Sequence, residues 1–159
     1  MTFIESETIE LKSSVVADLC KEAIAFANTR VGTLYIGVED NGTVIGVDSA
    51  DRVTLQINNM VRDSIKPDIT MFVHYETQVI NDKQIIAVIV QEGTDRPYYL
   101  GSKGLKPSGV YVRNGTSTDP ASDTAIRKMI RETDGDSFET MRSLEQNLSF
   151  QAAEAQFAK

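Results

Sequence analysis

Apolar and polar positions along the first third of the chain predict a strand, a helix and a second strand. Residues 8–12 alternate apolar and polar side chains, which is typical of a half-buried strand. Residues 15–28 carry apolar side chains at helical spacing, and Ser14 can cap that helix. The continuous, mostly apolar run at 32–38 predicts a well-buried strand. This alternation of elements indicates a compact domain that begins close to the first residue.

A hairpin signal follows this strand directly. Asn41 and Gly42 are a strong two-residue turn pair, and the apolar positions in residues 43–47 predict the returning strand. Residues 50–65 then return to helical spacing, and Pro67 ends this second helix. The chain therefore predicts a hairpin between two helices.

The next segment predicts two more paired strands. Residues 70–80 and 83–93 are strand-like, with a turn at Asn81 and Asp82 between them. A loop rich in Gly, Pro and Lys at 96–109 separates them from a short strand at 110–115.

A final helix is predicted over residues 119–133, with Pro120 at its start. The chain becomes polar after Asp134, and residues 134–137 indicate a break. We therefore divide the chain into a domain over residues 1–134 and a polar C-terminal helical tail over residues 135–159.

This order of elements mixes hairpins with helices, so it fits neither strict strand–helix alternation nor an all-β fold. We predict an α+β domain with a mixed, largely antiparallel sheet and helices packed mainly on one face.

Composition narrows the possible classes. A single cysteine, Cys20, allows no internal disulfide, and with the single histidine, His74, it cannot form a Cys/His zinc site. No apolar run approaches the ~18 residues of a membrane span, and the acidic start lacks a signal-peptide pattern. The sequence contains no P-loop, nucleophile elbow, HExxH pair or EF-hand loop. These features favour a cytoplasmic protein.

The charge is acidic overall but uneven along the chain. The formal net charge is −7 and the pI is about 4.7, which argues against a general nucleic-acid binder. Residues 96–131 nevertheless contain seven basic residues against two acidic ones, Asp119 and Asp123. The basic residues are Arg96, Lys103, Lys106, Arg113, Arg127, Lys128 and Arg131. A local basic face inside an acidic chain is therefore expected.

Several motifs together resemble one known family. The stretches "ESETIELK" and "IAFANTRVGTLYIGVEDNGTVIGV" are followed later by "RPYYL" and "GVYVRNGTSTDPAS". In this combination they resemble the Schlafen AlbA-type domain, over roughly Glu5 to Arg131. The sequence departs from the pattern at Val31, where the family usually has the first glycine of a pair, whereas Gly32 remains. The resemblance implies a nucleic-acid-binding module of a bacterial transcriptional regulator.

The resemblance also implies a candidate catalytic site. Animal Schlafens carry a related core that cleaves structured RNA with three carboxylates and a divalent cation. By position these carboxylates are similar to Glu5, Glu10 and Asp40, and Lys12 matches the lysine after the second acid. Oxygen ligands suit Mg²⁺ or Mn²⁺, and such an ion can activate water for phosphodiester cleavage. Alternatively, these acids are a solvated terminus and an ordinary turn residue.

The candidate nucleic-acid-binding residues lie in the basic segment. Lys103 and Lys106 occupy the Gly-rich loop and can follow a phosphate backbone, with Arg113 on the adjoining strand. Tyr98 and Tyr99 can stack on exposed bases, or they simply pack at an edge of the sheet.

Three functions remain open from the sequence. The first is a nucleic-acid-binding module of a transcriptional regulator, with DNA or RNA as the partner. The second is a metal-dependent endoribonuclease using the three carboxylates. The third is a protein-interaction or dimerisation module, in which the acidic tail docks a partner or a second copy. Met141, Leu144 and Leu148 provide an apolar stripe at helical spacing in this tail, which either folds back on its own domain or pairs with another copy.

Overall fold

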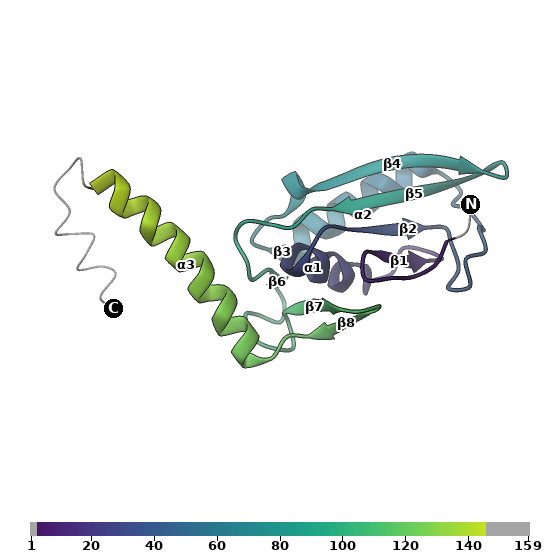
Figure 1. Ribbon diagram of the computed structural model, residues 1–159. Helices are drawn as coiled ribbons and strands as arrows, with labels where there is room; N and C mark the ends of the chain where they lie inside the picture. The colour runs from purple at the N-terminus through teal and green to yellow at the C-terminus, as the bar shows by residue number, and fades with distance from the viewer. Residues whose placement is uncertain (1–2, 146–159) are drawn as a thin grey trace.

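The main sheet has four strands in the order β1-β2-β5-β4 (Figure 1). The computed structural model describes the backbone of residues 3–145 and the side chains of residues 3–134 of the 159-residue chain. The strands are β1 (Ile9–Lys12), β2 (Gly32–Ile36), β4 (Val73–Ile80) and β5 (Lys83–Val90). β1 runs parallel to β2, whereas the other two pairings are antiparallel. The predicted mixed, largely antiparallel sheet and the α+β class are therefore confirmed.

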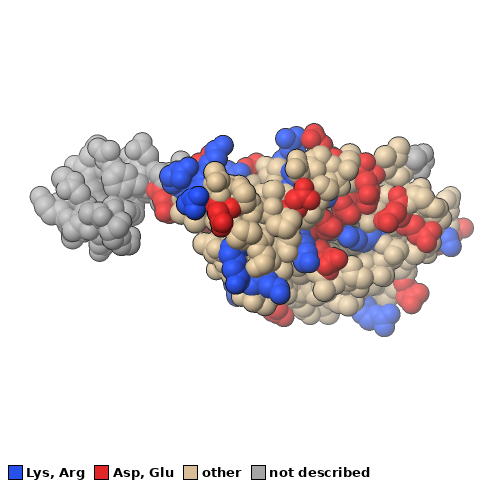
Figure 2. All heavy atoms as spheres, turned by 90° about the horizontal axis from the view of Figure 1, so that it is seen from below, with Lys and Arg blue, Asp and Glu red and all other residues tan. Residues whose placement is uncertain are grey.

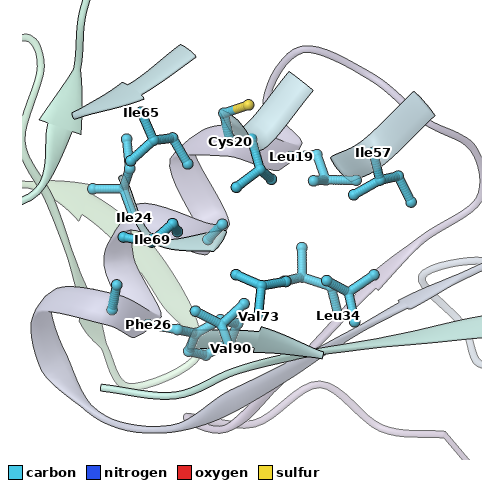
Figure 3. Packing of buried hydrophobic residues seen from close by; sticks show 14 of the residues in the cluster. Leu19, Cys20, Ile24, Phe26, Leu34, Ile57, Ile65, Ile69, Val73 and Val90 are labelled. Atoms are coloured by element: carbon cyan, nitrogen blue, oxygen red, sulfur yellow. The ribbon is translucent and has the colours of Figure 1, made fainter. Parts of the chain in front are cut away.

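Two helices, α1 (Leu19–Thr29) and α2 (Ala50–Ser64), cover one face of this sheet (Figure 1). Apolar side chains from both helices and from the sheet form the main core, which Figure 3 shows from close by. Burying these side chains supplies most of the folding free energy, at roughly 25 cal/mol per Å² of apolar surface. The core includes Leu19, Ile24, Phe26, Leu34, Ile57, Ile65, Ile69, Val73, Ile86 and Val90.

Gly32, which the chain retains from the glycine pair usual in the family, has a clear steric role. A Cβ atom added to Gly32 would lie 2.1 Å from Cδ1 of Phe26, so only glycine lets the helix end and the strand begin so close to this ring. Val31 is exposed and does not require the left-handed region, so the departure from the family pattern is accommodated without strain.

Two further sheets of two strands each form what we call the second layer. β3 (Ile65–Lys66) pairs with β6 (Tyr99–Leu100), and β7 (Tyr111–Asn114) pairs with β8 (Ser117–Pro120). The β7–β8 hairpin lies on the opposite side of α1 from β4 (Figure 1). This hairpin carries the residues that close the candidate site.

Helix α3 (Asp123–Glu145) packs its first turns on the second layer and then extends away from the domain (Figure 1). It continues through residues 134–137, where we expected a break. None of the helices in residues 3–145 is both long and apolar enough to span a bilayer. The side chains of the predicted apolar stripe, Met141, Leu144 and Leu148, lie outside the described part of the chain.

The structure corrects three local expectations. α1 begins at Leu19, with Asp18 rather than Ser14 at the N-cap position. Residues 43–47 do not form the predicted strand. Val44 makes only an isolated β-bridge to Val38. Pro120 ends strand β8 rather than starting a helix.

The side chain of Asn28 connects α1 to the second layer. Its Nδ2 donates to the backbone oxygens of Tyr98, at 3.1 Å, and Tyr111, at 2.9 Å. Its Oδ1 accepts a bond of 2.8 Å from the backbone N–H of Tyr98. Asn28 is 3% exposed, so these bonds satisfy a buried amide that water cannot reach. One side chain thus fixes where two later segments lie against the helix.

We predict that Asn28→Asp lowers the free energy of unfolding by on the order of 3 kcal/mol, because the carboxylate keeps the shape but loses both donors. Urea denaturation measures this change. The matched control is Asn58→Asp, since Asn58 makes a single 3.4 Å contact with the Tyr75 hydroxyl. The control should cost less than about 1 kcal/mol. Equal losses in both variants would contradict a special role for Asn28.

Candidate functional site

Four charged side chains from three elements meet at the β1 edge of the sheet. In β1, the period of two directs Glu10 and Lys12 to the same face as Leu34 and Ile36 of β2, which is the face covered by the helices. α1 contributes Glu22, and β7 contributes Arg113. We call these four residues the charge cluster. Strand periodicity predicts one shared face for Glu10 and Lys12, and the register confirms it.

Arg113 is the centre of the charge cluster. Its side chain is only 1% exposed, and its Nη1 lies 2.7 Å from Oε1 of Glu10. Nη2 donates to the backbone oxygens of Ser6, at 2.7 Å, and Ile9, at 3.2 Å. The guanidinium also lies over the ring of Phe26, 5.2 Å from its centroid. These contacts tie the β7–β8 hairpin to the first residues of the domain.

Lys12 and Thr118 complete the contacts of Glu22. The Lys12 Nζ lies 3.1 Å from Glu22 Oε2 and 3.7 Å from Glu10 Oε2. The Thr118 hydroxyl donates to Glu22 Oε1 and accepts a 3.1 Å bond from Arg113 Nη1. Two carboxylates therefore face two cations, and the charge cluster is compensated internally.

Burial changes the protonation equilibria of this cluster. Burial raises the pKa of Glu10 to about 7, against the lowering effect of its hydrogen bond to Arg113 and with the added repulsion of Glu22 and Glu5. Burial alone would lower the pKa of Lys12, but the charges of Glu22 and Glu10 raise it overall. Lys12 therefore stays protonated while Glu10 titrates near neutral pH.

The three predicted metal ligands are not all brought together, although Glu5 lies close enough to Glu10 to raise its pKa. Glu5 lies beside β1, where its Oε2 accepts a 3.4 Å bond from the backbone N–H of Leu11. Asp40 is exposed in the turn after β2 and lines a separate open hollow with Ser13, Glu39 and Asn41. Within the part of the chain whose side chains are described, no three acidic, His or Cys residues are grouped to hold a metal ion.

The residues present therefore do not fit a divalent cation. The Arg113 guanidinium lies 2.7 Å from Glu10 Oε1 and already supplies a compensating positive charge. We derive no catalytic step through Mg²⁺ or Mn²⁺ at Glu5, Glu10 and Asp40.

The predicted nucleic-acid-binding residues separate into a buried and an exposed group. Arg113 is enclosed in the charge cluster, and Tyr98 is 1% exposed, with its hydroxyl accepting a bond from the Asp95 backbone N–H. Neither side chain can reach a phosphate or a base, so both expectations are corrected. Tyr99 is half-buried against the apolar cluster beneath α3, whereas Lys103 and Lys106 are exposed.

Sequence reasoning missed two residues of this site. Glu22 is a buried acid between Leu19 and Phe26, on the apolar face of α1. A charged residue within an apolar helical stripe was the signal that could have revealed it. Thr118 carried no comparable signal, because hydroxyl residues are common in turns and at exposed strand positions.

Comparisons with known proteins support one family and one fold. A family model described as Schlafen, AlbA_2 matches residues 5–122. A solution structure of the N-terminal domain of a RecG-related protein from Nitrosomonas europaea, a candidate ATP-dependent DNA helicase, matches with a TM-score of 0.54 and 28% identity. That match covers 69% of this chain and 79% of the other chain.

A second solved structure shows the same fold only. The DIP2311 protein from Corynebacterium diphtheriae matches with a TM-score of 0.58 and 18% identity, over 79% of this chain and 24% of that protein. No curated protein matches the chain at a significant level.

We predict that Arg113→Met lowers the free energy of unfolding by about 3–5 kcal/mol, because it removes a buried cation together with its hydrogen bonds to Glu10 and to two backbone oxygens. The matched control is Arg30→Met, since Arg30 pairs with Glu7 at 3.2 Å on the exposed surface. That control should cost no more than about 1 kcal/mol. Urea denaturation near neutral pH compares the two. A loss in Arg113→Met no larger than in the control would show that the cluster does not stabilise the domain.

The raised pKa of Glu10 predicts a pH dependence of stability. In the unfolded chain Glu10 titrates near 4.5, whereas its pKa in the folded chain is about 7. The folded state therefore binds more protons in this window, and the contribution of Glu10 to stability is lost as the pH rises through 7. Relative to Glu10→Gln, which does not titrate, the wild type should lose on the order of 2 kcal/mol between about pH 5 and about pH 8. Urea denaturation of both proteins across this range measures the difference, and a constant difference would contradict the raised pKa.

Proposed function

The chain belongs to the Schlafen AlbA_2 family, and we propose that it serves as a nucleic-acid-binding module. The similar RecG-related protein is described as a candidate DNA helicase, which supports a role near nucleic acid. The observation that carries the proposal is a group of exposed basic side chains at one end of the domain.

We call this group the basic end. It consists of Lys103, Lys106, Arg127, Lys128 and Arg131, all of which are exposed. Among the side chains that the structure describes, none of these five forms an ion pair with a carboxylate. Their charges are therefore available to phosphate groups.

One small apolar cluster holds both parts of the basic end. Ile126 and Met129 of α3 pack with Val110, directly after the loop that carries the two lysines. The loop backbone is fixed by hydrogen bonds, including 3.0 Å from the Lys103 N–H to Leu100 and 2.8 Å from the Gly109 N–H to Lys106. The lysines are thus presented by an ordered loop beside the helix, and a pre-ordered site loses less entropy on binding.

The distribution of charge favours one orientation on a polyanion. Figure 2 shows Lys and Arg gathered toward the end of the molecule from which α3 extends, whereas Asp and Glu dominate the opposite end. The acidic end is repelled by phosphates and the basic end is attracted, so an overall net charge of −7 is compatible with binding through one surface.

A binding role accounts for the geometry better than a nuclease role. The carboxylates implied by the resemblance either face cations, as Glu10 does, or lie apart, as Asp40 does. The cations of the basic end, in contrast, are exposed, and Lys and Arg are the residues that most often contact phosphates. We further propose that the module serves a transcriptional regulator, in which binding without cleavage is the required activity.

We predict salt-dependent binding to duplex DNA through the basic end. The double variant Lys103→Glu with Lys106→Glu should lower affinity at least about tenfold and reduce the salt slope by about two, since each phosphate contact contributes about 0.9. Fluorescence anisotropy titrations at several salt concentrations, with duplex DNA and with structured RNA, measure both quantities and identify the preferred nucleic acid.

The matched control for this experiment is Arg52→Glu with Lys83→Glu. Both residues are exposed, and the change in net charge is identical, but they lie on α2 and β5. Affinity that falls equally in both double variants would indicate a response to net charge alone. No binding of the wild type to either nucleic acid at low salt would overturn the proposed function.

A further inference from the structure

Strand β4 leaves one long edge of the main sheet open. It spans Val73–Ile80 and, within residues 3–145, pairs only with β5, at the end of the strand order. The opposite edge, β1, is four residues long and carries charged side chains, and Arg113 binds the backbone oxygen of Ile9 there. Natural sheets usually protect an edge by such features. β4 is twice as long, and Glu76 is its single acidic side chain, so it is less protected than β1.

The turn after β4 determines which backbone groups face outward. Asn81 and Asp82 form a two-residue turn with φ values of 52° and 64°, so the flanking residues Ile80 and Lys83 exchange hydrogen bonds. The bond of 2.8 Å from the Gln91 N–H to the Phe72 oxygen continues this alternation at the other end. The N–H and C=O groups of four alternate residues therefore face away from β5. These residues are Val73, Tyr75, Thr77 and Val79.

The side chains along this edge are suited to burial. Val79 is 65% exposed, and Met71, just before the strand, is 76% exposed. The neighbouring helix α2 adds Leu55, 61% exposed, on the same helical face as Asn58, which contacts Tyr75. The eight residues of β4 include no Lys, Arg or Pro that would hinder pairing. Backbone groups and apolar side chains are therefore available together.

We propose that β4 pairs with β4 of a second copy of this chain, in antiparallel orientation about a two-fold axis. A symmetric antiparallel pair places like-facing residues opposite each other, so either Glu76 or Thr77 lies on the axis if most of the strand is to pair. An axis at Glu76 would place two like charges directly opposite each other, which is destabilising.

The register centred on Thr77 is complementary throughout. It sets Tyr75 opposite the partner's Val79, which is a favourable aromatic and β-branched pair, and Glu76 opposite the partner's Gln78. The outward N–H and C=O groups of Tyr75, Thr77 and Val79 all find partners. The two four-stranded sheets then form one continuous sheet, with the helices of both copies on the same face.

The test is the oligomeric state of the full chain by sedimentation equilibrium. The wild type should show a mass approaching twice 17.5 kDa as concentration rises. Val79→Lys places a charge on the edge, and Thr77→Pro removes one outward N–H without touching a bond to β5. Each variant should raise the dissociation constant at least about tenfold, since either change is a recognised way of blocking edge pairing. Ile4→Lys, a similar change at a residue 68% exposed before β1, should leave it unchanged.

Cysteine cross-linking tests the register. Opposite residues of a non-hydrogen-bonded pair have Cα atoms about 4.5 Å apart, within disulfide range. Under mild oxidation, a mixture of Glu76→Cys and Gln78→Cys chains should cross-link faster than either variant alone. Faster linkage of Glu76→Cys with itself would overturn the register. A wild type that stays monomeric at millimolar concentration, or a dimer unaffected by both edge variants, would overturn the interface.

Discussion

The ion pair between Arg113 and Glu10 joins residues that are 103 positions apart in the chain. Removing two charges from water costs several kcal/mol each, so such a pair persists only where further hydrogen bonds satisfy the remaining atoms. Here two backbone oxygens, a threonine hydroxyl and Glu22 supply most of these contacts. The position of the β7–β8 hairpin depends on this arrangement.

The hairpin in turn determines where the surface charges lie. The end of α1 holds it at two points, since the backbone N–H of Arg113 donates to Thr29 Oγ1 at 2.9 Å and the Asn28 side chain donates to the Tyr111 oxygen. The loop with Lys103 and Lys106 and the first turns of α3 lie on the two chain segments that flank the hairpin. The buried charge cluster thus helps to position the exposed side chains of the basic end. Of the two groups, only the basic end is accessible to a ligand.

Local patterns in the sequence were sufficient for most of the fold. The β4–β5 hairpin follows from strand-like residues around Asn81 and Asp82, and the placement of Glu10 and Lys12 on one face follows from strand periodicity. The site was harder to predict, because burial of Arg113 depends on partners from β1 and α1 that no local window contains. β8 was missed since its residues, Ser117–Pro120, have turn-like composition and gain their strand conformation only by pairing with β7.

The long separation between Glu10 and Arg113 also matters for how the domain forms during synthesis. Glu10 and Glu22 leave the ribosome well before residue 113, so for most of translation neither carboxylate has the guanidinium that accompanies it in the finished fold. Contacts of such high sequence separation form late, because closing the intervening loop costs entropy before any bond is gained. The helix and the first strand can meet early, but their shared edge can only be sealed when the β7 segment arrives. A nascent chain that ends before the arginine therefore has only Lys12, among the members of the charge cluster, to compensate two acids at a partly closed edge.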